Sequence, residues 1–140
     1  MLGKASNARL DTCDPKIQRV IREADRQLSK RGILDLTVLC GHRGEVEQNQ
    51  AYRDGTSKKK WPESDHNQLP SPAVDVTAFP VDWKDTIRQA RLAGYIMAIG
   101  DVLDIELDWG DDWNNNGRSA DETFHDMPHL ALSKRERAKP

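Results

Sequence analysis

Two histidines and one aspartate stand out among the residues that could hold a metal ion. His66 lies in a polar, proline-containing segment, Asp75 in an alternating apolar segment, and His129 directly after Met127 and Pro128. Two histidines and a carboxylate that leave a fourth position open are the ligand set of a catalytic zinc site. Metal ligands are recognised by convergence in space, so this set predicts a site only if the strands carrying Asp75 and His129 are neighbours.

Asp126 and Arg43 could add acid–base and electrostatic chemistry to such a site. Asp126 precedes His129 by three residues, and a carboxylate so near a metal ligand can take a proton from water and deliver it to a leaving amine. Arg43 follows a predicted strand, where a guanidinium group can bind a carboxylate or a developing oxyanion. A turn-ending aspartate and an ordinary surface ion pair are the simpler interpretations of the two residues.

Residues 112–118 have the spacing of a calcium-binding loop. Oxygen-bearing side chains stand at the first, third and fifth positions and glycine at the sixth, as in the first half of an EF-hand loop. The twelfth position is Thr123 instead of a bidentate glutamate, so the full pattern fails, and a turn rich in asparagine and glycine explains the same residues without a metal. The candidate ligands of Ca²⁺ are Asp112, Asn114, Asn116, the backbone carbonyl of Arg118, Asp121 and Glu122.

Hydrophobic periodicity predicts the elements that must position these residues. It predicts helices over 15–32, 44–53 and 83–103, and strands over 33–40, 73–79, 105–109 and 128–132. Helices without regular alternation with strands indicate an α+β fold. Gly94, inside the third helix, suggests close packing against a neighbour. The segments 56–72 and 110–124 are predicted loops, with Lys58–Lys60 as a solvated tip.

The composition describes a small, polar and nearly neutral chain. Of its 140 residues 36% are hydrophobic, and 21 basic against 23 acidic residues give a net charge of −2. This balance does not favour nucleic-acid binding, and no apolar run approaches the roughly 20 residues that span a membrane. The length predicts a single domain over 1–140, with a core over about 14–132 and a solvated basic tail over 133–140.

The cysteines and the N-terminal segment bear on the compartment. Cys13 and Cys40 are too few for a disulfide framework, so we expect reduced thiols, with Cys40 in the core. The first fifteen residues lack the apolar stretch of a secretory signal. Both observations indicate a protein that is made and kept in the cytoplasm.

Several ordered sequence blocks resemble the signature of the M15 zinc metallopeptidases. The family includes D-alanyl-D-alanine dipeptidases and carboxypeptidases and the L-alanyl-D-glutamate peptidase endolysins of phages. The resemblance runs from about Asp14 to Leu132 and implies a small antiparallel sheet with flanking helices, as in hedgehog and D-Ala-D-Ala peptidases. The blocks are Ser64-x-His66, Ala73-x-Asp75, Asp126-x-x-His129, Gly41-His42-Arg43 with Gln48, Tyr52 and Gly55, and Trp109-Gly110-Asp111-Asp112-Trp113.

This resemblance implies a role for each residue of the blocks. It implies His66, Asp75 and His129 as ligands of Zn²⁺. Asp126 would be the catalytic acid and base, and Arg43 would stabilise the tetrahedral oxyanion. Substrate-binding roles are implied for Gln48 beside the arginine, for Ser64, which would also support the ligand loop, and for Trp113, which would wall the cleft.

The sequence departs from the family pattern in two places. The gap between His66 and Asp75 is longer than usual and contains Pro-Ser-Pro, and Asp111 replaces the second glycine of a Trp-Gly-Gly-Asp-Trp block. Asp126 stands where the dipeptidases tend to carry glutamate. Together with the short chain, this aspartate favours the endolysin branch.

The expected function is therefore that of a zinc endopeptidase which cleaves the L-alanyl-D-glutamate bond of peptidoglycan stem peptides during phage lysis. We expect a monomer with peptidoglycan as its partner, without nucleic-acid binding or stable membrane insertion. It would accumulate in the host cytoplasm and reach the wall after the membrane is permeabilised. Ca²⁺ would be a regulatory ion, as in some endolysins of the resembled family. The alternatives are a D-alanyl-D-alanine carboxypeptidase or dipeptidase with the same zinc site, and a non-catalytic calcium-dependent wall-binding module.

Overall fold

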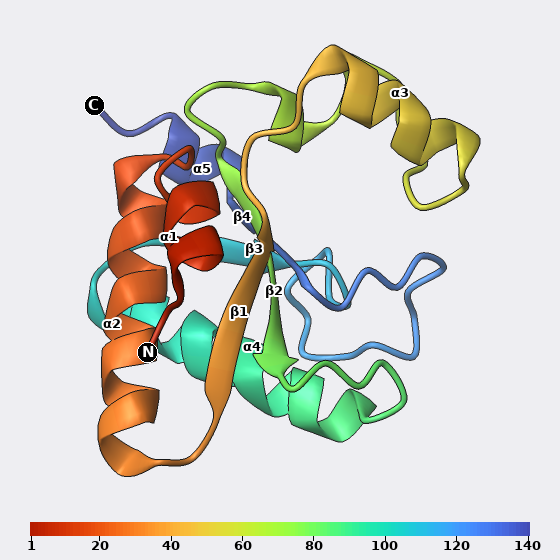
Figure 1. Ribbon diagram of the computed structural model, residues 1–140. Coiled ribbons are helices and arrows are strands. Elements are labelled where there is room, and N and C mark those ends of the chain that lie inside the picture. The colour runs from red at the N-terminus through yellow and green to blue at the C-terminus, as the bar shows by residue number, and fades with distance from the viewer.

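A four-stranded antiparallel sheet organises the chain, and the computed structural model describes all residues 1–140. Its strands are β1 (Asp35–Cys40), β2 (Ala73–Phe79), β3 (Leu107–Trp109) and β4 (His129–Leu132). The strand order is β1-β2-β4-β3, so the last strand of the sequence lies between β2 and β3 (Figure 1). This order makes β2 and β4 neighbours, which is the condition for Asp75 and His129 to meet.

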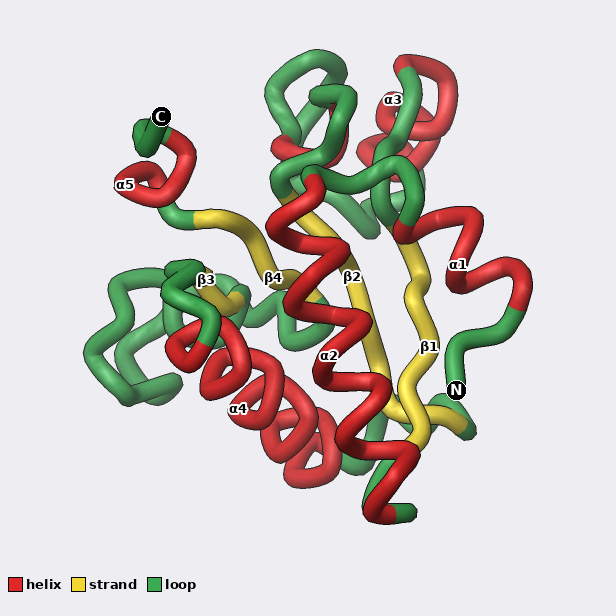
Figure 2. Tube along the Cα trace, turned by 90° about the vertical axis from the view of Figure 1, so that its left-hand side faces the viewer, coloured by secondary structure: helices red, strands yellow, loops and turns green.

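Helices cover one face and one edge of this sheet. The long helices α2 (Pro15–Arg31) and α4 (Thr86–Val102) pack against each other and against the sheet, while α1 (Lys4–Leu10) lies along β1 (Figure 2). The shorter α3 (Glu45–Arg53), the 3₁₀ turn η1 (Asp65–Asn67) and α5 (Lys134–Arg137) belong to the connections and the C-terminal end. The α+β fold class is thereby confirmed. None of these helices combines the length and the apolar character that crossing a bilayer requires.

Local sequence explains where α2 begins and ends. The side chain of Asp14 accepts a hydrogen bond from the backbone N–H of Lys16, and Pro15 occupies the first turn. At the other end Gly32 takes the left-handed conformation, with φ of 64°, and closes the helix. One face of α2 is buried as the periodicity predicted, through Ile17, Val20, Ile21, Ala24 and Leu28.

The core lies on the helical side of the sheet. Nineteen buried apolar residues form one cluster, which includes Val74, Val76 and Ala78 of β2. Because successive side chains of a strand point to opposite faces, Asp75 and Thr77 point away from this cluster. The sheet therefore keeps its second face for polar residues.

The structure corrects the expectation for Gly94. A Cβ added there would meet nothing within 4 Å, so this glycine does not mediate close packing. Close backbone approach occurs instead at Gly41 and Gly110, where an added Cβ would overlap carbonyl oxygens of Arg9 and Asp126 respectively. The sequence analysis also missed α1, because a helix of seven residues with a polar sequence has too short an apolar pattern to detect.

The basic residues of the C-terminal segment are exposed, as its sequence suggested, but the segment also forms α5 and is anchored through one buried acidic residue. Ser133 caps α5 by accepting a hydrogen bond from the backbone N–H of Glu136 at 3.0 Å. The Glu136 side chain is 1% exposed and accepts hydrogen bonds from the ammonium groups of Lys16, at 2.8 Å, and Lys139, at 3.0 Å. The Lys16 hydrogen bond in particular lowers the pKa of Glu136 to about 2. A single buried carboxylate therefore docks the C-terminal segment on α2.

Replacing Glu136 with glutamine should lower the free energy of unfolding at neutral pH by about 1–3 kcal/mol, since charge-assisted hydrogen bonds are lost while the side-chain volume is kept. The pKa of Glu136 is depressed from 4.5 to about 2, so its stabilising effect is complete above 4.5 and is lost as the pH falls towards 2. Urea unfolding of the wild type and of Glu136→Gln should show a difference in the free energy of unfolding that narrows as the pH falls from 4.5 towards 2. Glu63→Gln, on an exposed residue, is the control, and a difference that does not depend on pH would contradict the assignment.

Candidate metal centre

The register of the sheet aligns three side chains that could bind a metal. Asp75 of β2 is paired directly with His129 of β4 and, on its other side, with Cys40 of β1. A bulge between Val38 and Cys40 shifts the register there. Directly opposed residues of paired strands share a face, so Asp75 and His129 stand next to each other on the polar side of the sheet.

The remaining candidate ligand, His66, is positioned by a capped turn. Ser64 accepts a hydrogen bond from the backbone N–H of His66 at 3.2 Å, and Asn67 accepts one from the backbone N–H of Ser64 at 3.0 Å. The carbonyl of His66 accepts a hydrogen bond from the backbone N–H of Arg43 at 2.7 Å. This capping box fixes η1 against the segment after β1, and Ser64 supports the turn that carries His66.

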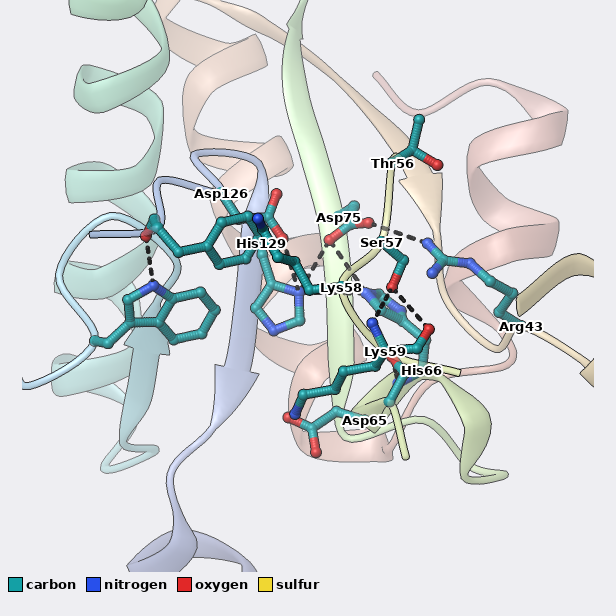
Figure 3. A pocket seen from close by; sticks show the side chains of 13 residues that line it. Arg43, Thr56, Ser57, Lys58, Lys59, Asp65, His66, Asp75, Asp126 and His129 are labelled. Carbon is teal, nitrogen blue, oxygen red and sulfur yellow. Dashed lines mark hydrogen bonds and ion pairs between the residues drawn. The ribbon is translucent and has the colours of Figure 1, made fainter. Parts of the chain in front are cut away.

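Three candidate ligand atoms converge at nearly equal distances. His66 Nε2 lies 3.2 Å from Asp75 Oδ1, His129 Nδ1 lies 3.2 Å from the same oxygen, and the two nitrogens are 3.3 Å apart (Figure 3). In a tetrahedral zinc site with bonds of about 2.0–2.1 Å, neighbouring ligand atoms are about 3.3–3.4 Å apart. The triangle formed by His66, Asp75 and His129 therefore has the size of one face of such a tetrahedron, which leaves the fourth position for water or substrate.

The other side of the His66 ring has the hydrogen bond that a metal-binding histidine needs. His66 Nδ1 lies 2.6 Å from the carbonyl oxygen of Gly41, which can only accept, so Nδ1 carries the proton and Nε2 is left for a metal. Cys40 Sγ is 3.7 Å from the same Nδ1 and accepts a hydrogen bond from Arg43 Nη2 at 3.6 Å. Cys40, His66 and Asp75 form an alternative metal-binding group by proximity, but the occupied Nδ1 favours the set with His129.

Cys40 also differs from its expected place in the core. It is half-buried at the edge of the polar site, whereas Cys13 is the buried thiol, 1% exposed. Burial and the nearby Cys40 raise the pKa of the Cys13 thiol to about 12. The strand ends at Cys40, as the sequence suggested, but Val38 is its last buried residue, and the bulge between Val38 and Cys40 leaves Cys40 beside His66.

Electrostatics require a positive charge beside Asp75. Burial opposes the ionisation of Asp75, but hydrogen bonds from His129 and His66 outweigh it and hold the pKa of this carboxyl well below its usual range. Burial likewise lowers the pKa of His66, yet its hydrogen bonds with Asp75 and Cys40 raise it to about 10. A proton or a cation must therefore accompany the half-buried Asp75 carboxylate, and a bound metal must displace protons.

Asp126 is held beside this triangle by backbone contacts to Gly110. The backbone N–H of Asp126 donates to the carbonyl of Gly110 at 2.8 Å, and the backbone N–H of Gly110 donates to the carbonyl of His129 at 2.8 Å. Asp126 Oδ2 lies 4.0 Å from His129 Nδ1. Burial and the neighbouring Asp75 carboxylate raise the pKa of Asp126 above its ordinary value. Gly110 thus places a carboxyl group with a raised pKa at the edge of the metal position, where a general acid or base would act.

Asp111 and the longer His66–Asp75 gap do not disturb this arrangement. The side chain of Asp111 turns inward and pairs with His125 Nδ1, and its backbone φ is not positive, so this position does not need glycine. The added residues of the gap lie between His66 and Asp75 in the chain, and these two side chains still converge with His129. The pairing of Asp111 with His125 could not be predicted from the sequence, because fourteen residues separate the two.

Arg43 lies on the opposite side of the triangle, and Gln48 holds it there. Arg43 Nη2 is 3.7 Å from Asp75 Oδ2, and its Nη1 donates to Gln48 Oε1 at 3.0 Å. The same Gln48 oxygen accepts from Asn67 Nδ2 at 3.0 Å, and Gln48 is fully buried. Gln48 is therefore not available as the substrate contact that the resemblance implied, and its position is that of a residue which orients Arg43.

A cavity of about 390 Å³ opens over the metal position. One wall is aromatic: Trp113 stacks on Phe124 with ring centroids 6.2 Å apart and lies 5.5 Å from the His129 ring. The opposite wall is the segment 56–59, which includes two of the three exposed lysines of the predicted solvated tip Lys58–Lys60. The lining residues are Arg43, Thr56, Ser57, Lys58, Lys59, Ser64, Asp65, His66, Asp75, Trp113, Phe124, Asp126 and His129.

The predicted calcium loop forms a compact turn beside this cavity. Asp112 Oδ2 accepts a hydrogen bond from the backbone N–H of Gly117 at 2.8 Å, and Glu122 Oε1 accepts one from that of Trp113 at 2.9 Å. The amide of Asn116 donates to Asp121. These contacts gather the candidate oxygen ligands, and they equally satisfy an asparagine-rich turn, so the calcium site stays a prediction.

Comparisons with known proteins agree with this geometry. The family model described as phage L-alanyl-D-glutamate peptidase matches residues 1–133. The crystal structure of Serratia marcescens L-Ala D-Glu endopeptidase ChiX is similar, with a TM-score of 0.73 and 26% sequence identity over 99% of this chain and 95% of that chain. No curated protein sequence matches significantly.

The family match covers nearly the whole chain, and the candidate ligands, Asp126 and Arg43 all lie inside the matched residues. The similar structure is itself a peptidase of the same bond type and covers both chains almost completely. On these grounds the chain belongs to the family of phage L-alanyl-D-glutamate peptidases.

Proposed function

We propose that this peptidase is a zinc enzyme that cleaves the L-alanyl-D-glutamate bond of peptidoglycan stem peptides. The observation that carries the proposal is the triangle of His66 Nε2, Asp75 Oδ1 and His129 Nδ1, with sides of 3.2–3.3 Å. Two imidazoles and one carboxylate in this geometry suit tetrahedral Zn²⁺ with one open position. The substrate follows from the family and from the endopeptidase activity of the similar Serratia structure.

The chain's own residues would divide the chemistry of peptide hydrolysis between two sides of the cavity. Zinc, when bound, would supply a Lewis acid that polarises the scissile carbonyl and acidifies water. Asp126 would accept a proton from the attacking water and later donate it to the amino group that leaves. Arg43, fixed by Gln48, would present Nη2 to the negative charge that develops on the carbonyl oxygen. Trp113 would exclude water from one side.

The family membership favours the glutamyl bond over the D-alanyl-D-alanine bond of the alternative. We further propose that the enzyme starts in the host cytoplasm and reaches the wall once the membrane is permeabilised. In this proposal peptidoglycan is the only macromolecular partner and the enzyme acts as a monomer.

A digest of purified peptidoglycan with and without chelator tests the metal and the bond together. We expect hydrolysis that stops on chelation and returns with stoichiometric Zn²⁺, and mass spectrometry should detect new L-alanine carboxyl ends. Zinc should also raise the unfolding temperature of the metal-free protein, because it binds only the folded triangle. Release of free D-alanine would support the alternative peptidase, and carefully purified protein without zinc or zinc-dependent hydrolysis would contradict the proposal.

Asp126→Asn isolates the proton-transfer role. We expect kcat to fall by about 100- to 10,000-fold, because asparagine has a similar volume but cannot accept a proton from water. Zinc content and unfolding temperature should stay close to those of the wild type. Asp101→Asn, on an exposed residue at the far end of α4, is the matched control. Wild-type peptidase activity in the Asp126 variant would contradict the acid–base assignment. Wall binding without turnover in both the wild type and the variant would support the non-catalytic wall-binding module.

We also propose that the loop 112–122 binds Ca²⁺ as a regulatory ion. The gathered oxygens of Asp112, Asn114, Asn116 and Glu122 support this proposal, together with the direct continuation of the loop into Asp126. Ordering of the loop by calcium would steady Trp113 and Asp126 at the cavity.

Calcium titration should show whether the loop is a binding site. At a concentration of about 100 times Kd, Ca²⁺ should stabilise the folded zinc-loaded enzyme by about 2.7 kcal/mol. Mg²⁺ should act far more weakly, since the loop offers many oxygen ligands and Mg²⁺ gives up its water reluctantly. The variant Asp112→Ala should abolish the effect. Unchanged unfolding temperature and peptidase activity across the titration would remove calcium from the proposal.

A further inference from the structure

Lys58 reaches across the mouth of the active-site cavity. It belongs to the wall formed by residues 56–59, and its Nζ lies 5.5 Å from the ring centroid of Phe124 on the opposite wall. Phe124 stacks on Trp113, which in turn contacts His129. In Figure 3 the Lys58 side chain extends towards the side of the cavity that carries Asp126. The stacked rings of Phe124 and Trp113 thus connect Lys58 with His129, a candidate metal ligand.

The neighbouring cations have different surroundings. Lys60 places its Nζ 4.8 Å from the Tyr52 ring and does not line the cavity. Lys59 lines the cavity and has no ion pair, but its side chain extends towards Asp65 (Figure 3), whose pKa it helps Arg137 to lower. Arg43 is held by Gln48 and Asp75. Lys58 has no carboxylate within ion-pairing distance, so its charge faces the cavity with only an aromatic ring as partner.

The backbone on both sides of Lys58 is anchored, while the Lys58 side chain is exposed. Gln48 Nε2 donates to the carbonyl of Lys59 at 2.6 Å and to Ser57 Oγ at 2.9 Å, so a fully buried side chain anchors the residues on both sides of Lys58. The other end of Gln48 holds Arg43. One anchor therefore sets the position of Lys58 relative to the arginine at the reaction centre.

The substrate offers a better partner than the aromatic ring. A glutamate residue has two carboxyl groups, and when the peptide continues through one of them the other remains as an anion. A cation over an exposed ring is held weakly, whereas an ammonium–carboxylate hydrogen bond is charge-assisted and stronger. We propose that Lys58 leaves Phe124 and binds the free carboxylate of the glutamate residue on the leaving side of the scissile bond. This assignment rests on the proposed function and makes Lys58 the residue that selects an acidic residue there.

Two soluble peptidoglycan fragments test this selection. One has the free carboxylate on its glutamate residue, and in the other that group is a carboxamide of nearly the same shape. For the zinc-loaded enzyme with the acidic fragment, Lys58→Met should lower kcat/KM by about 10- to 100-fold, mainly through KM. With the carboxamide fragment, kcat/KM of the wild type should already be lower than with the acidic fragment by a similar factor. Lys58→Met should lower kcat/KM for the carboxamide fragment only slightly further. Lys58→Arg should restore most of the preference for the acid.

The matched control is Lys60→Met, which removes the same charge from the same segment outside the cavity. It should leave both rates unchanged, and all variants should keep the wild-type unfolding temperature because these lysines are exposed. Equal losses of the Lys58 variant on both fragments, or no loss on either, would overturn the role of Lys58 while leaving the peptidase function intact. A zinc-loaded wild type that cleaves neither fragment at the L-alanyl bond would overturn the proposed function itself and the role of Lys58 with it.

Discussion

The largely enclosed carboxylate of Asp75, whose side chain is 16% exposed, is the constraint on which the rest of the site depends. Asp75 lies on a central strand, and its Oδ1 is 3.2 Å from one nitrogen of each of two imidazole rings. A carboxylate is costly to remove from water unless a positive charge accompanies it. The structure meets this demand by bringing His66 from a capped turn, His129 from a neighbouring strand and Arg43 from the end of β1. The Asp75, His66 and His129 side chains together fit a metal ion, which would supply positive charge beside the carboxylate.

The strand order and the loop contacts follow from the same demand. Insertion of β4 between β2 and β3 puts His129 opposite Asp75, and the hydrogen bonds of Gly110 then tie Asp126 to that strand. At the other end Arg137 of α5 donates two hydrogen bonds of 3.0 Å to Asp65, next to His66. The C-terminal segment thereby braces the turn that carries a ligand, so distant parts of the chain fix one small group of atoms.

Sequence patterns could predict this framework wherever a residue type has a local or periodic meaning. Asp14, Pro15 and Gly32 marked α2, and the alternation of 73–79 marked β2 and the outward direction of Asp75. The convergence of the ligands needed the strand order, which comes only from tertiary packing, and was reached through family resemblance. Lys58 and Glu136 were missed for the opposite reason: each sits in a charged stretch that looks solvated, and only a distant partner, Phe124 or Lys16, reveals its place.

A chain with few apolar residues can still order long polar loops when buried polar groups act as their anchors. Gln48 is as buried as any leucine of the core, yet all of its hydrogen-bonding capacity is used on Arg43, Asn67 and the segment 57–59. A satisfied group of this kind costs little to bury and holds its partners in one geometry, which an apolar side chain cannot do. The hydrophobic residues are thus concentrated behind the sheet, and the polar excess of the composition builds the walls of the cavity. Near-neutral net charge thus hides a local arrangement in which Lys58 and Lys59 line the cavity wall while the carboxylates of Asp75 and Asp126 lie at the metal position.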